Sequence, residues 1–161
     1  DLPEVRAKIV SVGDQIENAS ISPTGVRAAF EAHGEILTVA GKHGPTRDIT
    51  NTAGVMEREP AWSPDGQSIA YFSDEPGLYA LHVASQYGSA EAGMGAVKKF
   101  ELPKEPAYYF HPQWSPDSKR IVFHDNRLNI WLLDTSTGKL SAVGEKNVYG
   151  GFSDESYEIS C

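Results

Sequence analysis

Three polar residues stand at the same place relative to a Ser-Pro dipeptide. Asn18, Glu59 and His111 each lie four residues before the serine of such a dipeptide. Carboxylates and imidazoles are common ligands of divalent cations and common groups for moving protons. The shared spacing predicts that the fold brings the three side chains to equivalent positions, if the segments around them are structural repeats.

Further polar residues follow the same spacing. Ser20 and Gln113 lie two residues before the first and third serines, where the second repeat has the apolar Ala61, and Arg58 directly precedes Glu59. Polar groups that converge on one place are typical of sites for polar ligands. The candidate ligand-binding residues are therefore Asn18, Ser20, Arg58, Glu59, His111 and Gln113. The alternative is a set of hydrated side chains with no specific ligand.

The serines belong to three sequence repeats. They are Ser22, Ser63 and Ser115, so the repeats are 41 and 52 residues apart. Each begins with a predicted tight turn that reads Ser-Pro-Thr-Gly, Ser-Pro-Asp-Gly or Ser-Pro-Asp-Ser. Proline sets the φ of the second turn residue, and glycine suits the last. The longer interval contains Ala84–Ala96, rich in Gly, Ala and Ser, for which we expect a surface loop.

Short apolar runs separated by polar turn residues follow each anchor, and no stretch shows ten residues of helical periodicity. This pattern predicts antiparallel strands and almost no helix. A period near 40 residues is typical of the four-stranded blades of β-propellers. We therefore predict an all-β fold, a single partial propeller domain over residues 1–161 with three four-stranded blades. The blades are expected at about 14–51, 57–102 and 108–144, with a strand of an adjoining blade in 1–13 and a tail in 145–161.

The repeats resemble those of TolB-type six-bladed propellers and, more closely, the amino-terminal propeller of tricorn proteases and tricorn-like serine peptidases. The resemblance covers roughly Val10 to Val143. The residues that carry it are Glu17–Gly25, Arg58–Gly66 with Ile69–Asp74, and Trp114–Lys119 with Arg127–Trp131. It implies that the first strand of each blade lines a central channel. Asn18, Glu59 and His111 would then form a ring at one mouth of that channel.

The peptidases that the chain resembles carry their chemistry in other domains, a PDZ domain and a catalytic domain with an activated serine. Neither is recognisable in these 161 residues, and no Gly-x-Ser-x-Gly motif occurs, since Gly151–Glu155 lacks the final glycine. The resemblance therefore implies a module related to a peptidase, of the kind that gates or filters peptides. It does not imply peptidase activity of this chain.

Three blades do not close a ring, because propellers have about 4–8 blades. Both ends of an open arc expose strand edges and apolar faces, which favours association. The simplest solution is a twofold homodimer in which two arcs close into a six-bladed ring. A fragment that needs its missing blades is the alternative. In the dimer, Glu59 and His111 of both copies could supply four ligands to a divalent cation, and no other cofactor is indicated.

Three functions remain open at this stage. The first is a non-catalytic module that self-associates and binds a peptide or small polar ligand at the channel mouth. The second is a hydrolase whose site is formed by Glu59 and His111 of two copies, with or without a metal, although no nucleophile–base pair is recognisable. The third is a truncated product with no function of its own.

The composition argues against several other classes of protein. With 22 acidic and 14 basic residues the net charge is −8, which disfavours a nucleic-acid partner. No apolar run approaches the roughly 18–20 residues of a membrane span, and no signal peptide is recognisable. The single cysteine, Cys161, excludes an internal disulfide and a multi-cysteine zinc site, but it could link two copies. The cellular compartment is left open.

Two other features invite a structural and a chemical interpretation. Trp62 and Trp114 directly precede two of the anchor serines, with Ile21 at the first, and we expect all three to pack between blades. His124 and Asp125 end a predicted strand, where they could form an imidazole–carboxylate pair that orients a base or a metal ligand.

Overall fold

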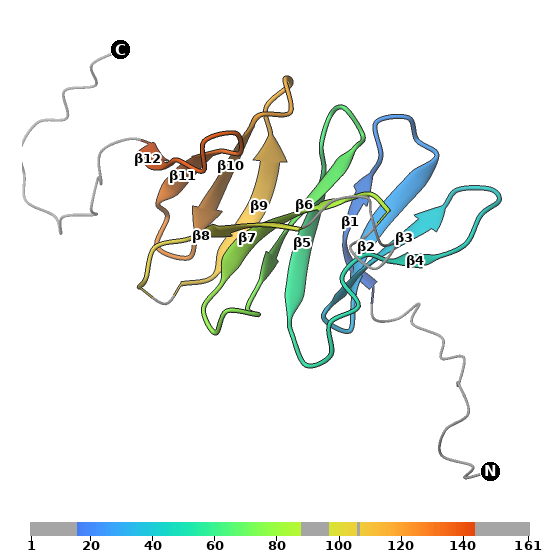
Figure 1. The fold of residues 1–161 in the computed structure, drawn as a ribbon, viewed down its shortest axis with the longest axis horizontal. Coiled ribbons are helices and arrows are strands. Elements are labelled where there is room, and N and C mark those ends of the chain that lie inside the picture. Colours follow the sequence, from blue (N-terminus) through green and yellow to red (C-terminus); the bar gives the residue numbers. More distant parts are fainter. Residues whose placement is uncertain (1–15, 88–96, 106, 144–161) are drawn as a thin grey trace, which may run out of the picture.

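The computed structural model describes residues 16–87, 97–105 and 107–143, and these residues form three four-stranded antiparallel sheets without a helix. Figure 1 shows the sheets following one another in chain order. The first consists of β1 (Ile16–Ile21), β2 (Arg27–Ala32), β3 (Glu35–Ala40) and β4 (Arg47–Asp48). The second consists of β5 (Glu57–Trp62), β6 (Ser68–Ser73), β7 (Ala80–Ser85) and β8 (Lys98–Glu101). The third consists of β9 (Tyr109–Trp114), β10 (Arg120–Asp125), β11 (Ile130–Asp134) and β12 (Leu140–Val143).

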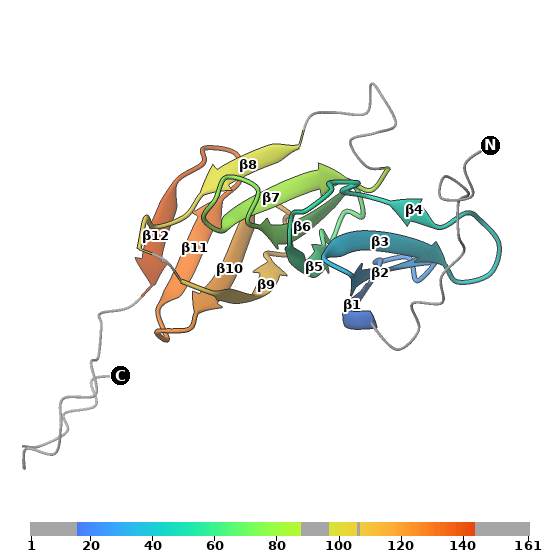
Figure 2. The same cartoon turned by 90° about the horizontal axis from the view of Figure 1, so that it is seen from below.

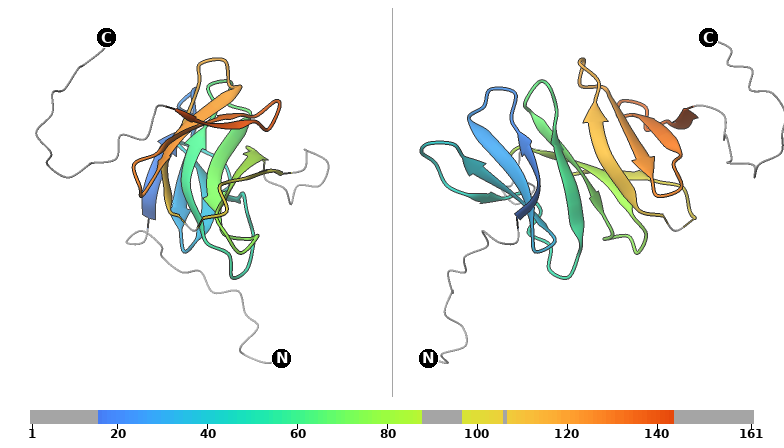
Figure 3. Two further views of the ribbon diagram at one scale, coloured as in Figure 1. Left: turned by 90° about the vertical axis from the view of Figure 1, so that its left-hand side faces the viewer. Right: turned by 180° about the vertical axis from the view of Figure 1, so that it is seen from behind.

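Each sheet is a blade whose strands pair in chain order. The first strands are neighbours, because β5 contacts both β1 and β9. Figures 2 and 3 show the blades stacked one behind another along the long axis of the molecule. The predicted all-β fold of three four-stranded antiparallel blades is therefore confirmed, with β1, β5 and β9 as the inner strands.

Two apolar seams hold the blades together. The first seam, between the first and second blades, is formed by Ala29, Ile36, Ile49, Trp62, Ile69, Tyr71 and Ala84. The second seam, between the second and third blades, is formed by Ala70, Phe72, Leu81, Val83, Leu102, Tyr109, Ile121, Phe123 and Leu133. Because side chains alternate along a strand, β6 contributes Ile69 and Tyr71 to one seam and Ala70 and Phe72 to the other.

The outer faces of the first and third blades carry apolar side chains that no blade formed by the described residues covers. Trp62 is buried in the first seam and Trp114 packs against the second, as expected. Ile21, at the equivalent position of the first blade, is 71% exposed. At the other end of the arc, Ile130 and Val143 pair across two strands and are both exposed. The described blades therefore present two uncovered halves of a seam.

The Ser-Pro anchors form the predicted turns. The amides of Gly25, Gly66 and Ser118 donate to the carbonyls of their anchor serines at 2.8 to 2.9 Å. Gly66 has a φ of +73°, in the left-handed region that favours glycine, and Ser118 adopts a φ of +57° at the equivalent position. The backbone of Ser118 is therefore strained. Its hydroxyl accepts a hydrogen bond from the amide of Asp65 in the neighbouring blade, at 3.1 Å.

Some expectations fall outside the described residues. They are the strand in 1–13, the tail in 145–161 with Cys161, and most of the Ala84–Ala96 loop. Ala84 and Ser85 still belong to β7, so this strand continues further than the sequence suggested. Within the described residues there is no helix long and apolar enough to cross a membrane.

Candidate functional site at the inner strands

The three aligned residues share an unusual backbone conformation. The φ angles of Asn18, Glu59 and His111 are +47°, +58° and +53°. Each residue begins a β-bulge in its inner strand, where two residues oppose one residue of the next strand. A left-handed conformation costs about 1–2 kcal/mol for a residue with a Cβ. Strain of this kind, repeated at three equivalent positions, is typical of residues that are held for a specific contact.

Hydrogen bonds between blades hold two of these bulges. The backbone amide of Glu59 donates to Oε2 of Glu31 at 3.2 Å, across the first seam. The backbone amide of His111 donates to Oε2 of Glu59 at 3.3 Å, across the second seam. In each seam, a carboxylate of the preceding blade thus accepts the amide of the next blade's bulge. We call this arrangement the amide–carboxylate ladder.

Glu31 is the most connected member of the ladder. Its side chain is buried and accepts a second hydrogen bond, from Nδ2 of Asn18 at 2.8 Å. Nε of Arg58 lies 3.9 Å from its other oxygen, Oε1. The guanidinium of Arg58 also lies 6.0 Å from the ring centre of Tyr108 and 5.7 Å from that of Phe110. Such cation–π geometry fixes the orientation of Arg58 without neutralising it.

His111 and His124 form a hydrogen-bonded imidazole pair in the third blade. Nδ1 of His111 lies 3.2 Å from Nε2 of His124. Nδ1 of His124 lies 3.3 Å from the carbonyl oxygen of Asp125, which can only accept. When His124 is neutral, the proton that faces this carbonyl is on Nδ1 and Nε2 accepts, so His111 donates from Nδ1. This order leaves Nε2 of His111 as an acceptor.

His124 and Asp125 do not form the imidazole–carboxylate pair that the sequence left open, because His124 contacts the carbonyl of Asp125 and not its carboxylate. The carboxylate of Asp125 accepts hydrogen bonds from the amides of Arg127 and Asn129 and from the side chains of Asn129 and Trp131. Burial by itself would raise the pKa of Asp125, but these hydrogen bonds outweigh it and lower the pKa below its ordinary value. Asp125 therefore stabilises the turn before β11 and is not an orienting group for His124.

The ladder brings together four of the six candidate residues: Asn18, Arg58, Glu59 and His111. Ser20 has a role in packing, because its hydroxyl accepts the backbone amide of Trp62 at 3.2 Å across the first seam. Gln113, at the equivalent position of the third blade, is exposed. Whether any of the six binds a ligand stays a prediction.

Sequence reasoning missed Glu31, and it considered His124 only with Asp125. The signal was present in the repeat, because both residues occupy the position that holds the buried Phe72 in the second blade. A charged or titratable residue in an otherwise apolar strand position needs polar partners. Here those partners are the bulge residues of the ladder.

A shallow cavity of about 270 Å³ adjoins this site at the second seam. Tyr108, whose ring centre lies 6.0 Å from the Arg58 guanidinium, forms part of its wall. Its other walls include Tyr79, Tyr109, Asp74 and Asn126. The mixture of aromatic rings and a few polar groups is typical of pockets that take a small polar or peptidic ligand.

The expected metal site is not formed by one copy. In the described part of the chain, no group of three or more His, Cys, Asp or Glu side chains is placed to hold a metal ion. The carboxylate of Glu59 reaches the backbone amide of His111, and the His111 imidazole contacts His124 instead. A four-ligand site built on Glu59 and His111 needs a second copy and stays a prediction.

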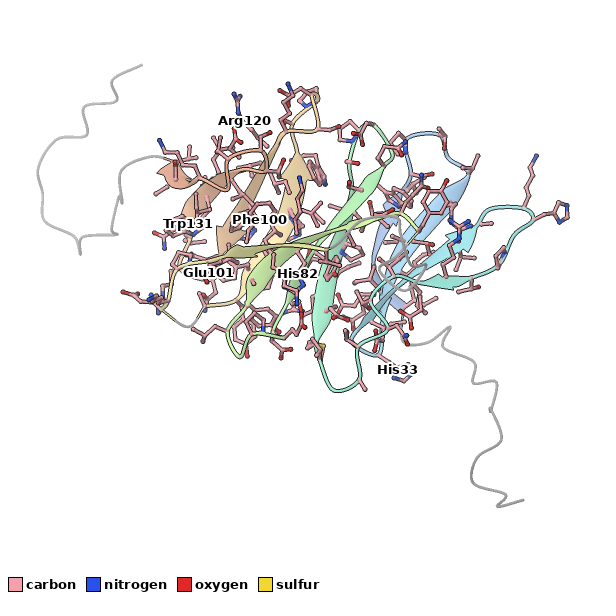
Figure 4. All side chains as sticks on the ribbon, in the orientation of Figure 1. His33, His82, Phe100, Glu101, Arg120 and Trp131 are labelled. Carbon is pink, nitrogen blue, oxygen red and sulfur yellow. The ribbon has the colours of Figure 1, made fainter. Side chains whose placement is uncertain are left out.

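Two buried titratable groups lie away from the inner-strand bulges. Burial raises the pKa of Glu57, whose Oε1 accepts the hydroxyl of Thr52 at 2.5 Å. Burial also lowers the pKa of His82, on β7, to about 4. Figure 4 shows His82 within the stack of blades, whereas His33 and Arg120 lie on opposite edges of the molecule.

Comparison with known proteins identifies relatives that are much longer. No protein-family model matches the chain. It is 27% identical over 148 residues to dipeptidyl-peptidase 5 of Porphyromonas gingivalis, which covers 88% of this chain and 21% of that protein. It is 26% identical over 134 residues to tricorn protease homolog 2 of Streptomyces coelicolor, which covers 78% of this chain and 11% of that protein. The chain therefore spans about a fifth, or less, of the curated relatives it matches.

Solved structures show the same fold. TolB from Agrobacterium tumefaciens matches with a TM-score of 0.65 and 19% identity, over 81% of this chain and 46% of that one. TolB from Acinetobacter baumannii matches with a TM-score of 0.60 and 21% identity, over 78% of this chain and 31% of that one. The resemblance to TolB-type and tricorn-type propellers is confirmed. At this level of identity, the TolB structures establish the fold alone.

Proposed function

We propose that the chain is a non-catalytic propeller module that self-associates to close its ring. At the channel mouth it binds a peptide or a small polar ligand. The observation that carries this proposal is the amide–carboxylate ladder. It holds strained polar residues of three blades side by side, at the inner strands where the channel of a closed ring would run.

The atoms left for a ligand indicate its chemistry. Asn18 donates from Nδ2 to Glu31, so its Oδ1 is available as an acceptor. Glu59 engages Oε2 with the amide of His111, and among the described residues no partner reaches its Oε1. The Arg58 guanidinium supplies donors beside these acceptors. A peptide backbone offers both donors and acceptors, and the adjoining cavity has room for one of its side chains.

Self-association is supported by the two uncovered faces at the ends of the arc. Ile21, Ala28 and Val39 form one row across the first blade, by their pairing register. Ile130 and Val143 form a row on the third blade. These faces occupy the positions that are buried in the internal seams, so a matching blade would cover them. A second copy supplies both matching faces at once.

The first test is the molar mass in solution, measured by light scattering on a sizing column. A value of twice 17.5 kDa supports the closed dimer. A value of 17.5 kDa across the accessible concentration range would overturn self-association and assign the uncovered faces to other blades of a longer protein.

The second test is calorimetric titration with unmodified tripeptides. We expect the substitution Glu59→Gln to weaken binding while keeping a side-chain oxygen for the His111 amide. The matched control is Glu101→Gln, which removes an exposed carboxylate on the outer strand β8 and should leave binding unchanged. If both variants bind the tripeptide equally well, Glu59 is not part of the binding site. Cleavage of the tripeptide, lost in His111→Ala, would instead support the alternative of a hydrolase.

A further inference from the structure

The internal seams define what the closing seam must contain. In both of them, the amide of a left-handed bulge residue, Glu59 or His111, meets a carboxylate of the preceding blade. By the repeat, the corresponding amide of the first blade belongs to Asn18, whose φ is +47°. In a closed ring this amide would point toward the third blade of the neighbouring copy.

The third blade has no carboxylate at the two positions that supply the acceptor. The position of Glu31 holds His124, and the position of Glu59 holds His111. The hydrogen-bond order of this pair resolves which nitrogen can accept. His124 Nε2 already accepts from His111 Nδ1, so the remaining acceptor is Nε2 of His111.

A second pair of groups follows the same logic. In the first seam, Ser20 accepts the backbone amide of Trp62 at 3.2 Å. The equivalent acceptor at the end of the arc is Gln113, and the equivalent amide is that of Ile21. Gln113 and Ile21 are both exposed, and the Gln113 side chain carries an amide oxygen that can accept.

We infer that the first blade of a second copy docks on the third blade. The amide of its Asn18 bonds to Nε2 of His111, and the amide of its Ile21 bonds to Gln113. This inference rests on the proposed self-association and adds the residues that set its register. His111 and His124 act as one unit, in which His124 is the positioning residue that holds the His111 tautomer. The apolar rows that contain Ile21 and Ile130 then cover one another.

The test compares self-association constants by sedimentation equilibrium. His111→Leu removes the acceptor, and we expect it to weaken dimerisation about tenfold, whereas His111→Gln should retain much of the affinity because its side-chain oxygen can accept. Glu101→Gln, at an exposed residue on the outer strand β8 of the second blade, is the control. Nitrogen NMR of the dimer should show His111 protonated on Nδ1 and not on Nε2.

The outcomes separate the two proposals. If the wild-type protein dimerises and His111→Leu and His111→Gln dimerise as tightly as Glu101→Gln, the register inference is wrong and self-association stands. If the wild-type protein is monomeric, both are wrong. The two variants are also compared by thermal unfolding at concentrations where both are monomeric. If His111→Leu then unfolds at a lower temperature than His111→Gln, its weaker dimerisation reflects a less stable blade, and the inference is overturned.

Discussion

The backbone amide of His111 donates a hydrogen bond to Oε2 of Glu59 at 3.3 Å, across the seam between the second and third blades. Glu59 is itself a left-handed residue whose own amide is accepted by Glu31 of the first blade. One residue thus accepts on one side and donates on the other. This relationship connects the inner strands β5 and β9 with β2 of the first blade, so hydrogen bonds as well as apolar seams join neighbouring blades.

Removing the acceptor at Glu59 should loosen the second seam. We expect Glu59→Ala to lower the free energy of unfolding by about 1–2 kcal/mol, because the amide of His111 loses its partner while its strained conformation remains. Glu59→Gln should cost less, since it keeps an oxygen. The measurement is urea unfolding, with Glu101→Ala as an exposed control expected to stay within about 0.5 kcal/mol of wild type. A loss for Glu59→Ala no larger than for the control would contradict the ladder.

Replacement by alanine should change the free energy of unfolding differently at two glycines, one in an anchor turn and one after β3. Gly66 has a φ of +73°, and a Cβ there would only touch Pro23 at 3.8 Å, so its cost is backbone strain. We expect Gly66→Ala to destabilise the protein by about 1–2 kcal/mol. Gly41 lies outside the left-handed region, and a Cβ there would lie 3.7 Å from the nearest carbonyl oxygens, which is an ordinary contact. Gly41→Ala should therefore be neutral or slightly stabilising in the same urea unfolding measurement.

Substitution of Asp125, which lies outside the candidate ligand site, should strongly lower the free energy of unfolding. Its two oxygens accept four hydrogen bonds from the turn and from Trp131, and the side chain is buried. Asp125→Ala leaves these donors without their acceptor and should cost about 2–4 kcal/mol in urea unfolding. Trp131→Phe removes the indole N–H and part of the ring volume, but it leaves the other three hydrogen bonds of Asp125, so it should cost clearly less. Similar losses for the two variants would show that indole packing, and not the hydrogen-bond cluster, stabilises this turn.

More of the fold than of the candidate site could be predicted from the sequence, for a physical reason. The Ser-Pro turns and the short apolar runs are local signals, and each repeat contains them independently, so the three sheets could be predicted. The contacts of the site are made between repeats. Glu31 reaches Glu59 across a seam, and spacing relative to the anchor serine does not reveal a partner on another strand. The bulge that turns Asn18, Glu59 and His111 into left-handed residues is also invisible to strand periodicity.

The Trp and Ile positions illustrate the same limit. Trp62, Trp114 and Ile21 align in sequence and were expected to pack alike between blades. Two of them do, because a preceding blade covers them, whereas Ile21 is exposed on the first blade. Alignment predicts which face a side chain occupies, but it does not predict what lies against that face.

The buried imidazole of His82 predicts a loss of stability in mild acid. His82 is 2% exposed, and among the described residues its Nε2 has no hydrogen-bond partner. Burial lowers its pKa from 6.5 to about 4, and nearby Lys99 acts in the same direction. The unfolded chain therefore binds a proton at this histidine before the folded chain does, so stability is complete above pH 6.5 and falls as the pH falls toward 4.

Between pH 6.5 and about pH 5 we expect a loss of about 2 kcal/mol from this group, measured by urea unfolding at several pH values. His82→Phe should flatten this slope, while His43→Phe, at an exposed histidine, should keep it. The raised pKa of Glu57 acts in the opposite sense, so the wild-type slope by itself does not decide the role of His82. The prediction is contradicted if the slope of stability against pH is flat and His82→Phe leaves it unchanged. The folded protein would then protonate His82 as readily as the unfolded chain does.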